Sequence, residues 1–217
     1  MTKPTIAILG GTGKEGPGLA LRWAYNGYPV LIGSRQAEKA EATAAELNQT
    51  LGKDTVRGCD NDQAARLADI SVLTVVQSAH QPALEGLRDA LQGKILVDAT
   101  ARVDFRDPHP PAPPSAGEIA QQILGPGVRV VAALQTVPAH TLKHNLGQRL
   151  EFDVLVCTDD VDAAQQVMYL IEGADMRAYY AGKLDNAVVV EGITSILISV
   201  NKHYKIKTAS VRITGVS

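Results

Sequence analysis

The sequence predicts an α/β protein with a Rossmann-type, doubly wound parallel sheet and a smaller C-terminal α/β extension. Two observations favour this fold class. Short apolar runs typical of buried strands alternate with helical patterns along most of the chain, which indicates a parallel sheet with crossover helices. A second, shorter alternation of strand and helix begins near residue 151. We therefore expect a larger domain over residues 1–150 and a smaller one over residues 151–217.

The composition is that of a globular protein. The chain has 217 residues, 45% of them apolar, and a net charge of −2 from 21 basic and 23 acidic residues. Because the charges are interspersed, we expect no nucleic-acid-binding face and no membrane-surface helix, and the single apolar runs are too short to span a bilayer. Met1 leads directly into the first strand, and Cys59 and Cys157 are isolated. These features favour a cytoplasmic protein with reduced thiols and no signal peptide.

A glycine-rich turn follows the first apolar run, residues 6–9. The spacing Gly11-x-Gly13-x-x-Gly16 then leads into a helical pattern that starts at Leu19. In dinucleotide-binding proteins one such glycine forms the tight turn, another admits the pyrophosphate and the third lets the helix pack on the strand. Free N–H groups at the start of the helix attract phosphate. We predict a dinucleotide site here; a plain tight turn between strand and helix is the alternative.

The residues after the second apolar run, 30–33, indicate which form of the cofactor binds. NAD-specific sites place a carboxylate at this point, where it binds the ribose 2′-hydroxyl. The chain instead has Ser34 and Arg35, with Lys39 one helical turn further along. A hydroxyl, a guanidinium and an ammonium bind a 2′-phosphate, which a carboxylate would repel. The sequence therefore predicts NADP(H). The alternative is that Arg35 and Lys39 are only surface residues at the helix expected over residues 37–51.

The rest of the larger domain continues the alternation of strands and helices. We expect strands at 55–58, 69–76, 94–98 and 128–134, and helices at 61–68, 82–91 and 116–124, the last capped by Ser115 with Glu118. Residues 77–80 and 135–139 directly follow strands, at the edge where ligands bind in such sheets. His80 could contact substrate there, although a solvated loop histidine is the commoner outcome. The proline-rich segment 107–114 is expected to be either a cover over a ligand or a stiff surface segment.

The C-terminal extension is expected to contain strands at 153–157 and 176–180, with a helix at 161–171 between them. The segment 186–201 is apolar on nearly all sides of a helix, so it must lie in the core or between subunits. We favour a subunit contact, and hence a homodimer. The tail 209–214 alternates like an edge strand.

The sequence lacks the usual proton-transfer groups of a reductase. No helical Tyr-x-x-x-Lys pattern occurs, because Lys183 follows Tyr179 and Tyr180 outside any helical pattern. His140 and His144 have a spacing that can hold a metal, but without a third ligand we interpret them as loop histidines and expect no metal site. Hydride transfer between two redox cofactors needs no such acid, because the two rings themselves donate and accept the hydride and the protein mainly aligns them. We therefore expect no catalytic side chain.

A set of motifs runs from the first strand into the last helix. They are Gly10-Gly-Thr-Gly13, Gly33-Ser-Arg35 with Glu38-Lys-Ala, Leu73-Thr74, Leu134-x-Thr136-x-Pro138-Ala139, Val156-Cys-x-Asp-Asp160, and Ala181-Gly-x-Leu-x-Asn186 with Glu191. Together these motifs resemble the NADPH-dependent reductases of the deazaflavin coenzyme F420.

This resemblance implies hydride transfer between NADP(H) and coenzyme F420, by direct contact of the two rings at the carboxyl edge of the sheet. With the glycine pattern, it assigns the following cofactor and substrate contacts: Gly11, Thr12, Gly13, Lys14, Glu15, Ser34, Arg35 and Lys39 for NADP, Gln77, Val103 and Ala139 on the nicotinamide side, and Gln135 on the substrate side. The smaller domain is expected to contribute to the deazaflavin site. Two alternatives stay open: an NADP-dependent reductase of a small carbonyl, imine or other flavin-like substrate, and a non-catalytic NADP-sensing protein.

Overall fold

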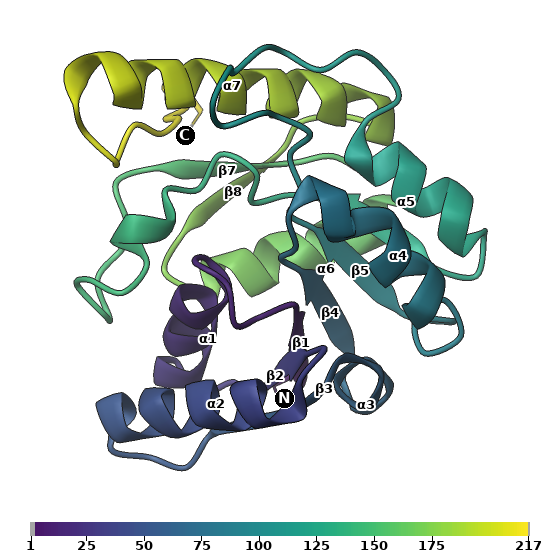
Figure 1. The fold of residues 1–217 in the computed structure, drawn as a ribbon. Helices are drawn as coiled ribbons and strands as arrows, with labels where there is room; N and C mark the ends of the chain where they lie inside the picture. The colour runs from purple at the N-terminus through teal and green to yellow at the C-terminus, as the bar shows by residue number, and fades with distance from the viewer. Residues whose placement is uncertain (1–2, 217) are drawn as a thin grey trace.

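The computed structural model describes residues 3–216, and its main feature is a six-stranded parallel sheet (Figure 1). The strands are β1 (Ile6–Leu9), β2 (Val30–Ser34), β3 (Val56–Asp60), β4 (Ile70–Leu73), β5 (Ile95–Asp98) and β6 (Arg129–Ala132). They lie in the order β3-β2-β1-β4-β5-β6, and every neighbouring pair is parallel. The chain therefore builds first on one side of β1 and then on the other. This is the doubly wound topology that the sequence predicted.

The strands are paired so that they all end at one edge of the sheet. Leu9, the last residue of β1, pairs with Leu73, the last of β4, and Leu73 pairs with Asp98 at the end of β5. On the other side, Ser34 of β2 pairs with Asp60 of β3. The polar residues that follow each strand are thereby collected along a single carboxyl edge.

Helices cover both faces of the sheet, and alternate residues of β1 show which helices lie where. Ile6 and Ile8 belong to a buried cluster that includes residues of α1 (Gly16–Tyr25) and α2 (Ala37–Leu51). Ala7 and Leu9 belong to a second cluster on the opposite face. That cluster includes residues of α3 (Asn61–Leu67), α4 (Gln77–Leu87) and α5 (Ala116–Leu124). Each strand residue thus packs on one of two helical layers, as a buried parallel sheet requires.

The C-terminal unit joins the free edge of β6. It consists of β7 (Asp153–Val156), α6 (Val161–Glu172), β8 (Arg177–Tyr180), the 3-10 turn η2 (Leu184–Asn186) and α7 (Ala187–Tyr204). β7 and β8 form a parallel pair, and Ala132 and Cys157 exchange two backbone hydrogen bonds of 2.9 Å in an isolated antiparallel bridge. The predicted strands and helix of this unit are therefore confirmed. The domain division at residue 150 stays a prediction.

Two neighbouring side chains of α1 connect the halves of the chain. Trp23 Nε1 donates to the Leu170 carbonyl of α6 at 2.7 Å. The Arg22 guanidinium is fully buried and donates to the carbonyls of Leu142 (2.9 Å) and His144 (2.5 Å). These bonds fix the segment after β6 against α1. These bonds could not be predicted from the sequence, because the partners are more than a hundred residues away.

Several predicted boundaries were wrong. The strand expected over 55–58 continues to Asp60, the strand expected over 128–134 ends at Ala132, and the helix expected over 82–91 is α4, Gln77–Leu87. The strand expected over 69–76 ends at Leu73, and residues 77–80 form the first turn of α4 instead of a loop. The reason is that the neighbouring strands end at Leu9 and Asp98, so the residues after Thr74 have no strand to pair with. The tail 209–214 forms no strand. It is attached to β7 through Asp153, whose N–H donates to Val211 O at 2.8 Å, so a single backbone bond replaces a ladder.

Helix α7 is the long apolar helix that the sequence predicted, and one of its faces is buried. The Glu191 carboxylate on that face accepts hydrogen bonds from the N–H groups of Arg102 and Ala116. On the opposite side Val189 and Ile196 are 61% and 58% exposed. Among the residues described, one segment, Leu184–Tyr204, is long and apolar enough to cross a membrane by length and composition. Its buried face nevertheless packs against protein through a satisfied polar group.

Replacing Arg22 tests how strongly the two halves are connected. Arg22→Ala leaves the buried Leu142 carbonyl and the part-buried His144 carbonyl without this donor, and we expect the free energy of unfolding to fall by about 3 kcal/mol. Urea unfolding followed by circular dichroism measures this change. Arg66→Ala removes an exposed pair with Asp62 and is the matched control, which should leave stability nearly unchanged. Equal losses in the two variants would contradict the role of Arg22.

Candidate active site

The glycine-rich turn between β1 and α1 has the close backbone contacts that its spacing predicts. Gly10 adopts φ +69°, which favours glycine. A Cβ on Gly16 would lie 2.5 Å from the Gly11 carbonyl oxygen, so the start of α1 packs directly on the turn. Within residues 3–216 no side chain caps the N-terminus of α1. Pro17 has no N–H, and the Gly18 N–H donates to the Glu15 carbonyl at 3.0 Å, so at this end of α1 the Gly16 N–H is the donor available to an anion.

A cleft of ≈ 1070 Å³ opens beside this turn. The predicted cofactor residues that line it are Thr12, Gly13, Ser34, Arg35 and Lys39. Ser34 is buried at the end of β2, whereas Arg35 and Lys39 are exposed. The structure thus brings the glycine turn and the basic residues, which the sequence separates, to one cleft. Their binding of NADP stays a prediction.

The opposite wall of the cleft comes from the end of β3 and the start of α3, which the sequence analysis did not consider as a site. Asn61 Oδ1 accepts a hydrogen bond from the Gly10 N–H at 3.0 Å and so holds the turn in place. The carboxylates of Asp60 and Asp62 line this wall. Asp60 caps α3, and Asp62 pairs with Arg66 at 2.8 Å. The sequence signal for Asn61 is its position directly after a strand, at the same edge as the turn.

Glu15 lies inside the predicted phosphate-binding turn, between Lys14, which is exposed, and Gly16. Its Oε1 is enclosed and has no hydrogen-bond partner among the described residues. Burial raises the pKa of Glu15 to about 8. The carboxyl is therefore mainly neutral at pH 7, which removes the repulsion that a carboxylate would exert on a nearby phosphate.

The residues predicted for the nicotinamide and the substrate follow β4, β5 and β6, outside the lining of this cleft. Gln77 is exposed at the start of α4, and Val103 is buried in the loop after β5. Ala139 is half-buried at the start of the 3-10 turn η1 (Ala139–Thr141). Gln135 is buried, and its Nε2 donates to the Asp98 carbonyl at 3.2 Å. All four lie at the same half of the carboxyl edge, and their roles stay predictions.

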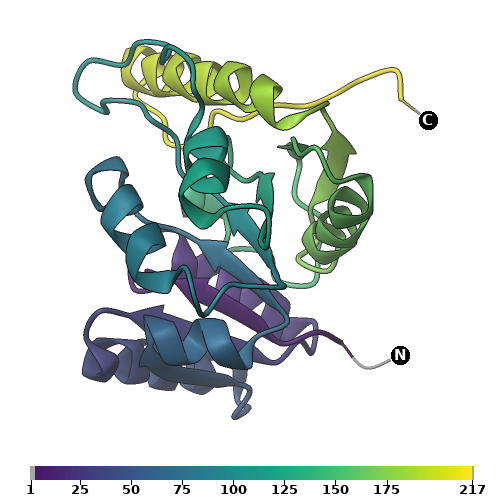
Figure 2. The ribbon, with the colours of Figure 1, turned by 90° about the vertical axis from the view of Figure 1, so that its right-hand side faces the viewer.

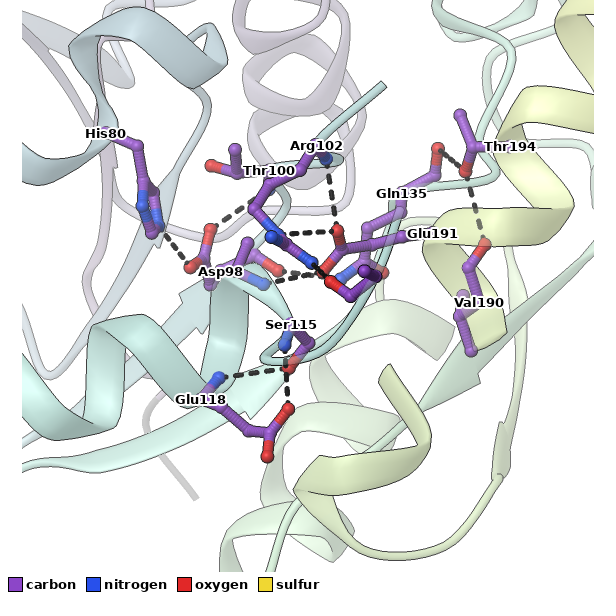
Figure 3. Close-up of polar contacts among 12 residues, drawn as sticks. His80, Asp98, Thr100, Arg102, Ser115, Glu118, Gln135, Val190, Glu191 and Thr194 are labelled. Atoms are coloured by element: carbon purple, nitrogen blue, oxygen red, sulfur yellow. Dashed lines mark hydrogen bonds and ion pairs between the residues drawn. The ribbon is translucent and has the colours of Figure 1, made fainter. Parts of the chain in front are cut away.

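A buried histidine–aspartate pair, which the sequence analysis missed, lies at this half of the edge (Figure 3). His80 on α4 is 4% exposed, and its Nε2 lies 2.6 Å from Oδ2 of Asp98 at the end of β5. The expectation of a solvated loop histidine was therefore wrong, because residues 77–80 are helical and turn His80 toward the sheet. The available signal was its helical spacing with Leu84 and Leu87, which are also buried.

Glu191 anchors the loop 99–115 to α7 (Figures 1 and 3). Its Oε2 accepts from Arg102 N (3.1 Å) and Nε (3.2 Å), and its Oε1 accepts from Ala116 N (2.6 Å). Burial raises the pKa of Glu191, and these hydrogen bonds act in the opposite direction. Arg102 Nη2 also donates to Ala112 O at 2.6 Å, so the proline-rich segment is held from both ends. That this segment covers a ligand stays a prediction.

The other polar groups singled out in the sequence lie apart from the cleft. His140 and His144 are both exposed in the segment after β6, and the described part of the chain holds no cluster of three or more His, Cys, Asp or Glu that could bind a metal. Cys59 and Cys157 are free and buried. Burial raises the pKa of Cys157 to about 11, which favours the protonated and less reactive thiol.

Comparison with known proteins identifies the family. The family described as NADP oxidoreductase, coenzyme F420-dependent, matches residues 5–102. The F420-dependent NADP reductase of Methanothermobacter thermautotrophicus is 38% identical over 223 residues, which cover 97% of this chain and 94% of the relative. The chain belongs to the F420-dependent NADP reductase family. The enzyme of the same name from Methanocaldococcus jannaschii is 36% identical and is covered to 98% of its length. The resemblance seen in the motifs is therefore confirmed.

Solved structures agree with the fold of this family member. A crystal structure of a candidate F420-dependent NADP-reductase from Arthrobacter sp. FB24 superimposes with a TM-score of 0.81 at 26% identity, covering 98% of this chain and all of that chain. An imine reductase from Bacillus cereus has a TM-score of 0.62 at 16% identity, over 93% of this chain and 63% of that one. The second likeness shows a shared fold alone.

The raised pKa of Glu15 predicts a pH dependence of nucleotide binding. The carboxyl is neutral below about pH 8 and ionises above it, so a negative charge then develops beside the bound phosphates. We expect the Kd for NADPH to rise about tenfold between pH 7 and pH 9.5, a loss of ~1.4 kcal/mol. Fluorescence titration with NADPH measures it. In Glu15→Gln the Kd for NADPH should change little over this range. If the Kd of that variant rises with pH as steeply as in the wild type, Glu15 is not the group responsible.

Proposed function

We propose that this protein transfers a hydride between NADP(H) and the 8-hydroxy-5-deazaflavin coenzyme F420. Family membership supports the pair of reactants, since the relatives are named F420-dependent NADP reductases. The observation that carries the proposal is the cleft itself, in which a glycine turn faces Ser34, Arg35 and Lys39 rather than a ribose-binding carboxylate at the end of β2.

The geometry fits NADP at two points. The pyrophosphate sits against Gly11 to Gly13 and the Gly16 N–H at the start of α1, with Lys14 beside it. The 2′-phosphate lies between the Ser34 hydroxyl, the Arg35 guanidinium and the Lys39 ammonium. Charge-assisted hydrogen bonds contribute about 1.5–3 kcal/mol each, so two of them favour NADP(H) over NAD(H) by about 10²–10⁴-fold.

The nicotinamide ring then lies over the ends of β4 to β6, next to Gln77, Val103 and Ala139. The deazaflavin approaches from the side of Gln135. Two rings that exchange a hydride carry the electronic changes themselves, and the protein's part is to hold them face to face and exclude water. The buried Val103 side chain and the enclosed Gln135 amide support such a partly apolar, fixed surface.

We also propose that the protein is a homodimer in the cytoplasm, with the smaller unit over 151–217 contributing to the deazaflavin side and to the dimer contact. The exposed Val189 and Ile196 lie on a helix whose other face is already packed. Burying an apolar side chain of this size yields about 1.5–3 kcal/mol, so a second α7 is a suitable partner. Both free cysteines are buried, as suits a reducing compartment.

The hydride transfer is tested by mixing the protein with NADPH and oxidised coenzyme F420. The visible absorbance of the deazaflavin should be bleached with one NADPH consumed per deazaflavin. Turnover of small carbonyls or imines with no bleaching would support the carbonyl reductase instead, and tight NADPH binding with no turnover would support a sensor. Either result would overturn the proposal.

The same assay tests the phosphate site when Arg35 is replaced. Arg35→Ala should raise the KM for NADPH about 10–100-fold and leave the KM for NADH nearly unchanged, because NADH lacks the 2′-phosphate. Arg149→Ala, an exposed arginine outside the cleft lining, is the control. Similar effects of Arg35→Ala on both nucleotides would mean that Arg35 does not bind the phosphate.

The dimer is tested by light scattering after size-exclusion chromatography. The wild type should have twice the mass of one 23.0 kDa chain, and Ile196→Glu should shift it toward the single-chain mass, because a charge would be buried in the contact. Tyr169→Glu on α6, at a side chain that is 65% exposed, is the control. A wild type that elutes as a single chain would reject this contact.

A further inference from the structure

The His80–Asp98 pair lies beside the residues assigned to the nicotinamide and substrate. Gln77 precedes His80 on α4 by three positions, which places the two on one side of the helix. The Gln135 amide donates to the backbone oxygen of Asp98 at 3.2 Å. Thr100 follows Asp98 closely, and its hydroxyl is enclosed without a partner among the described residues. Figure 3 shows His80, Thr100 and Gln135 around Asp98.

The hydrogen bonds of Asp98 determine which nitrogen of His80 carries a proton. Asp98 is fully buried; its Oδ1 accepts from Thr100 N at 3.0 Å, and its Oδ2 lies 2.6 Å from His80 Nε2. Because an ionised carboxylate only accepts, this pattern assigns the proton of the neutral ring to Nε2. The Nδ1 atom has no partner within residues 3–216 and is not among the enclosed unpaired atoms. Nδ1 is therefore the atom that can exchange a proton with a ligand or with water.

The charges around the pair leave Asp98 as the electrostatic partner of His80. Four carboxylates on or around α4 have other partners: Glu85 with Gln81 (2.8 Å), Glu118 with the Ser115 N–H (2.7 Å), Asp62 with Arg66 (2.8 Å), and Glu191 with Arg102 (3.2 Å), while Arg88 and Asp89 follow α4 at its far end. A buried carboxylate in direct contact stabilises a positive charge on the imidazole. The arrangement resembles the acid–base pairs in which a carboxylate orients a histidine.

We propose that His80, oriented by Asp98, supplies the proton that accompanies hydride transfer to the substrate ring and removes it in the reverse direction. This inference rests on the proposed function. NADPH gives up a hydride, two electrons with one proton, and becomes NADP⁺; the acceptor ring then needs one further proton to be neutral. His80 Nδ1–H donates that proton and becomes the neutral imidazole, which water reprotonates. The balance is NADPH + H⁺ + oxidised coenzyme F420 giving NADP⁺ + reduced coenzyme F420. The expectation that no side chain takes part in catalysis is thereby revised.

His80→Gln tests the inference, because glutamine stays polar but cannot donate a proton in this way. We expect kcat for NADPH oxidation by coenzyme F420 to fall about 10²–10³-fold, with the Kd for NADPH unchanged within about twofold. The wild-type rate of NADPH oxidation should decline with rising pH as His80 loses its proton, and this decline should be absent in the variant. His144→Gln is the matched control, because the His144 side chain is exposed after β6 and its bond with Arg22 is made by the backbone carbonyl, which the variant keeps.

A second readout does not depend on activity. In ¹⁵N NMR spectra of the nucleotide-free protein, the His80 ring signal is identified by its absence in His80→Gln and followed as the pH is varied. Its shift should change when NADP⁺ is added, whereas the His144 signal should not. If His80→Gln fails to fold, Asp98→Asn should lower kcat and change the shift of the His80 ring signal, because the ring loses its carboxylate partner.

The outcomes separate this inference from the proposed function. An active wild type whose His80→Gln variant keeps the same rate and pH profile overturns the role of His80 alone. A ring signal that neither titrates nor responds to NADP⁺ also overturns it, and leaves only a structural pair between α4 and β5. A wild type that does not bleach coenzyme F420 rejects the proposed function, while the NMR titration still decides whether His80 exchanges a proton beside the nucleotide.

Discussion

The structure depends on the parallel pairing of β1 with β2 and β4. This pairing places the ends of the strands at one edge, because Leu9 is opposite Leu73 and Leu73 is opposite Asp98. Parallel strands must be joined by crossovers, so every strand end is followed by a polar turn at the same edge. The glycine turn, the basic residues after β2, and the polar residues after β5 and β6 are neighbours for this reason. A change of register in one strand would move one part of the site away from the others.

Buried carboxyl groups at this edge are stabilised in three different ways. Glu15 has no partner for Oε1, and burial raises its pKa to about 8, so it is mainly neutral at pH 7. Glu191 accepts three hydrogen bonds from Arg102 and Ala116, and these offset its burial. Asp98 accepts from Thr100 and contacts a titratable ring, that of His80. Since a buried charge is costly without a partner, each environment gives the same functional group a different state: a mainly neutral carboxyl in the glycine turn, a structural anchor and the partner of a buried histidine.

The C-terminal unit is connected to the site by directional bonds as well as by apolar packing. Figure 2 shows α7 and the loop 99–115 together at one end of the molecule, away from the N-terminal strands. The loop follows β5, so its attachment through Glu191 links α7 to the edge where Asp98 lies. The Arg22 guanidinium connects the segment after β6 to α1 in the same way. The same segment includes Ala139, a predicted nicotinamide contact. The packing of α1 therefore helps to set the position of that residue.

The sequence by itself determined the alternation of strands and helices, the sheet class and the glycine turn between β1 and α1, because those features depend on residues close together in the chain. The run 6–9 followed by Gly11, Gly13 and Gly16 is such a local pattern, and the helix over residues 37–51 was predicted with its observed ends. Only the tertiary structure decided that His80 is buried against Asp98 and that Glu191 binds Arg102, because these partners come from different elements. It also decided where β4 ends and which face of α7 stays exposed. The physical reason is that strand length and side-chain pairing depend on residues that are distant in the sequence and meet only in the fold. Periodicity and turn preferences depend on residues that are adjacent in the sequence.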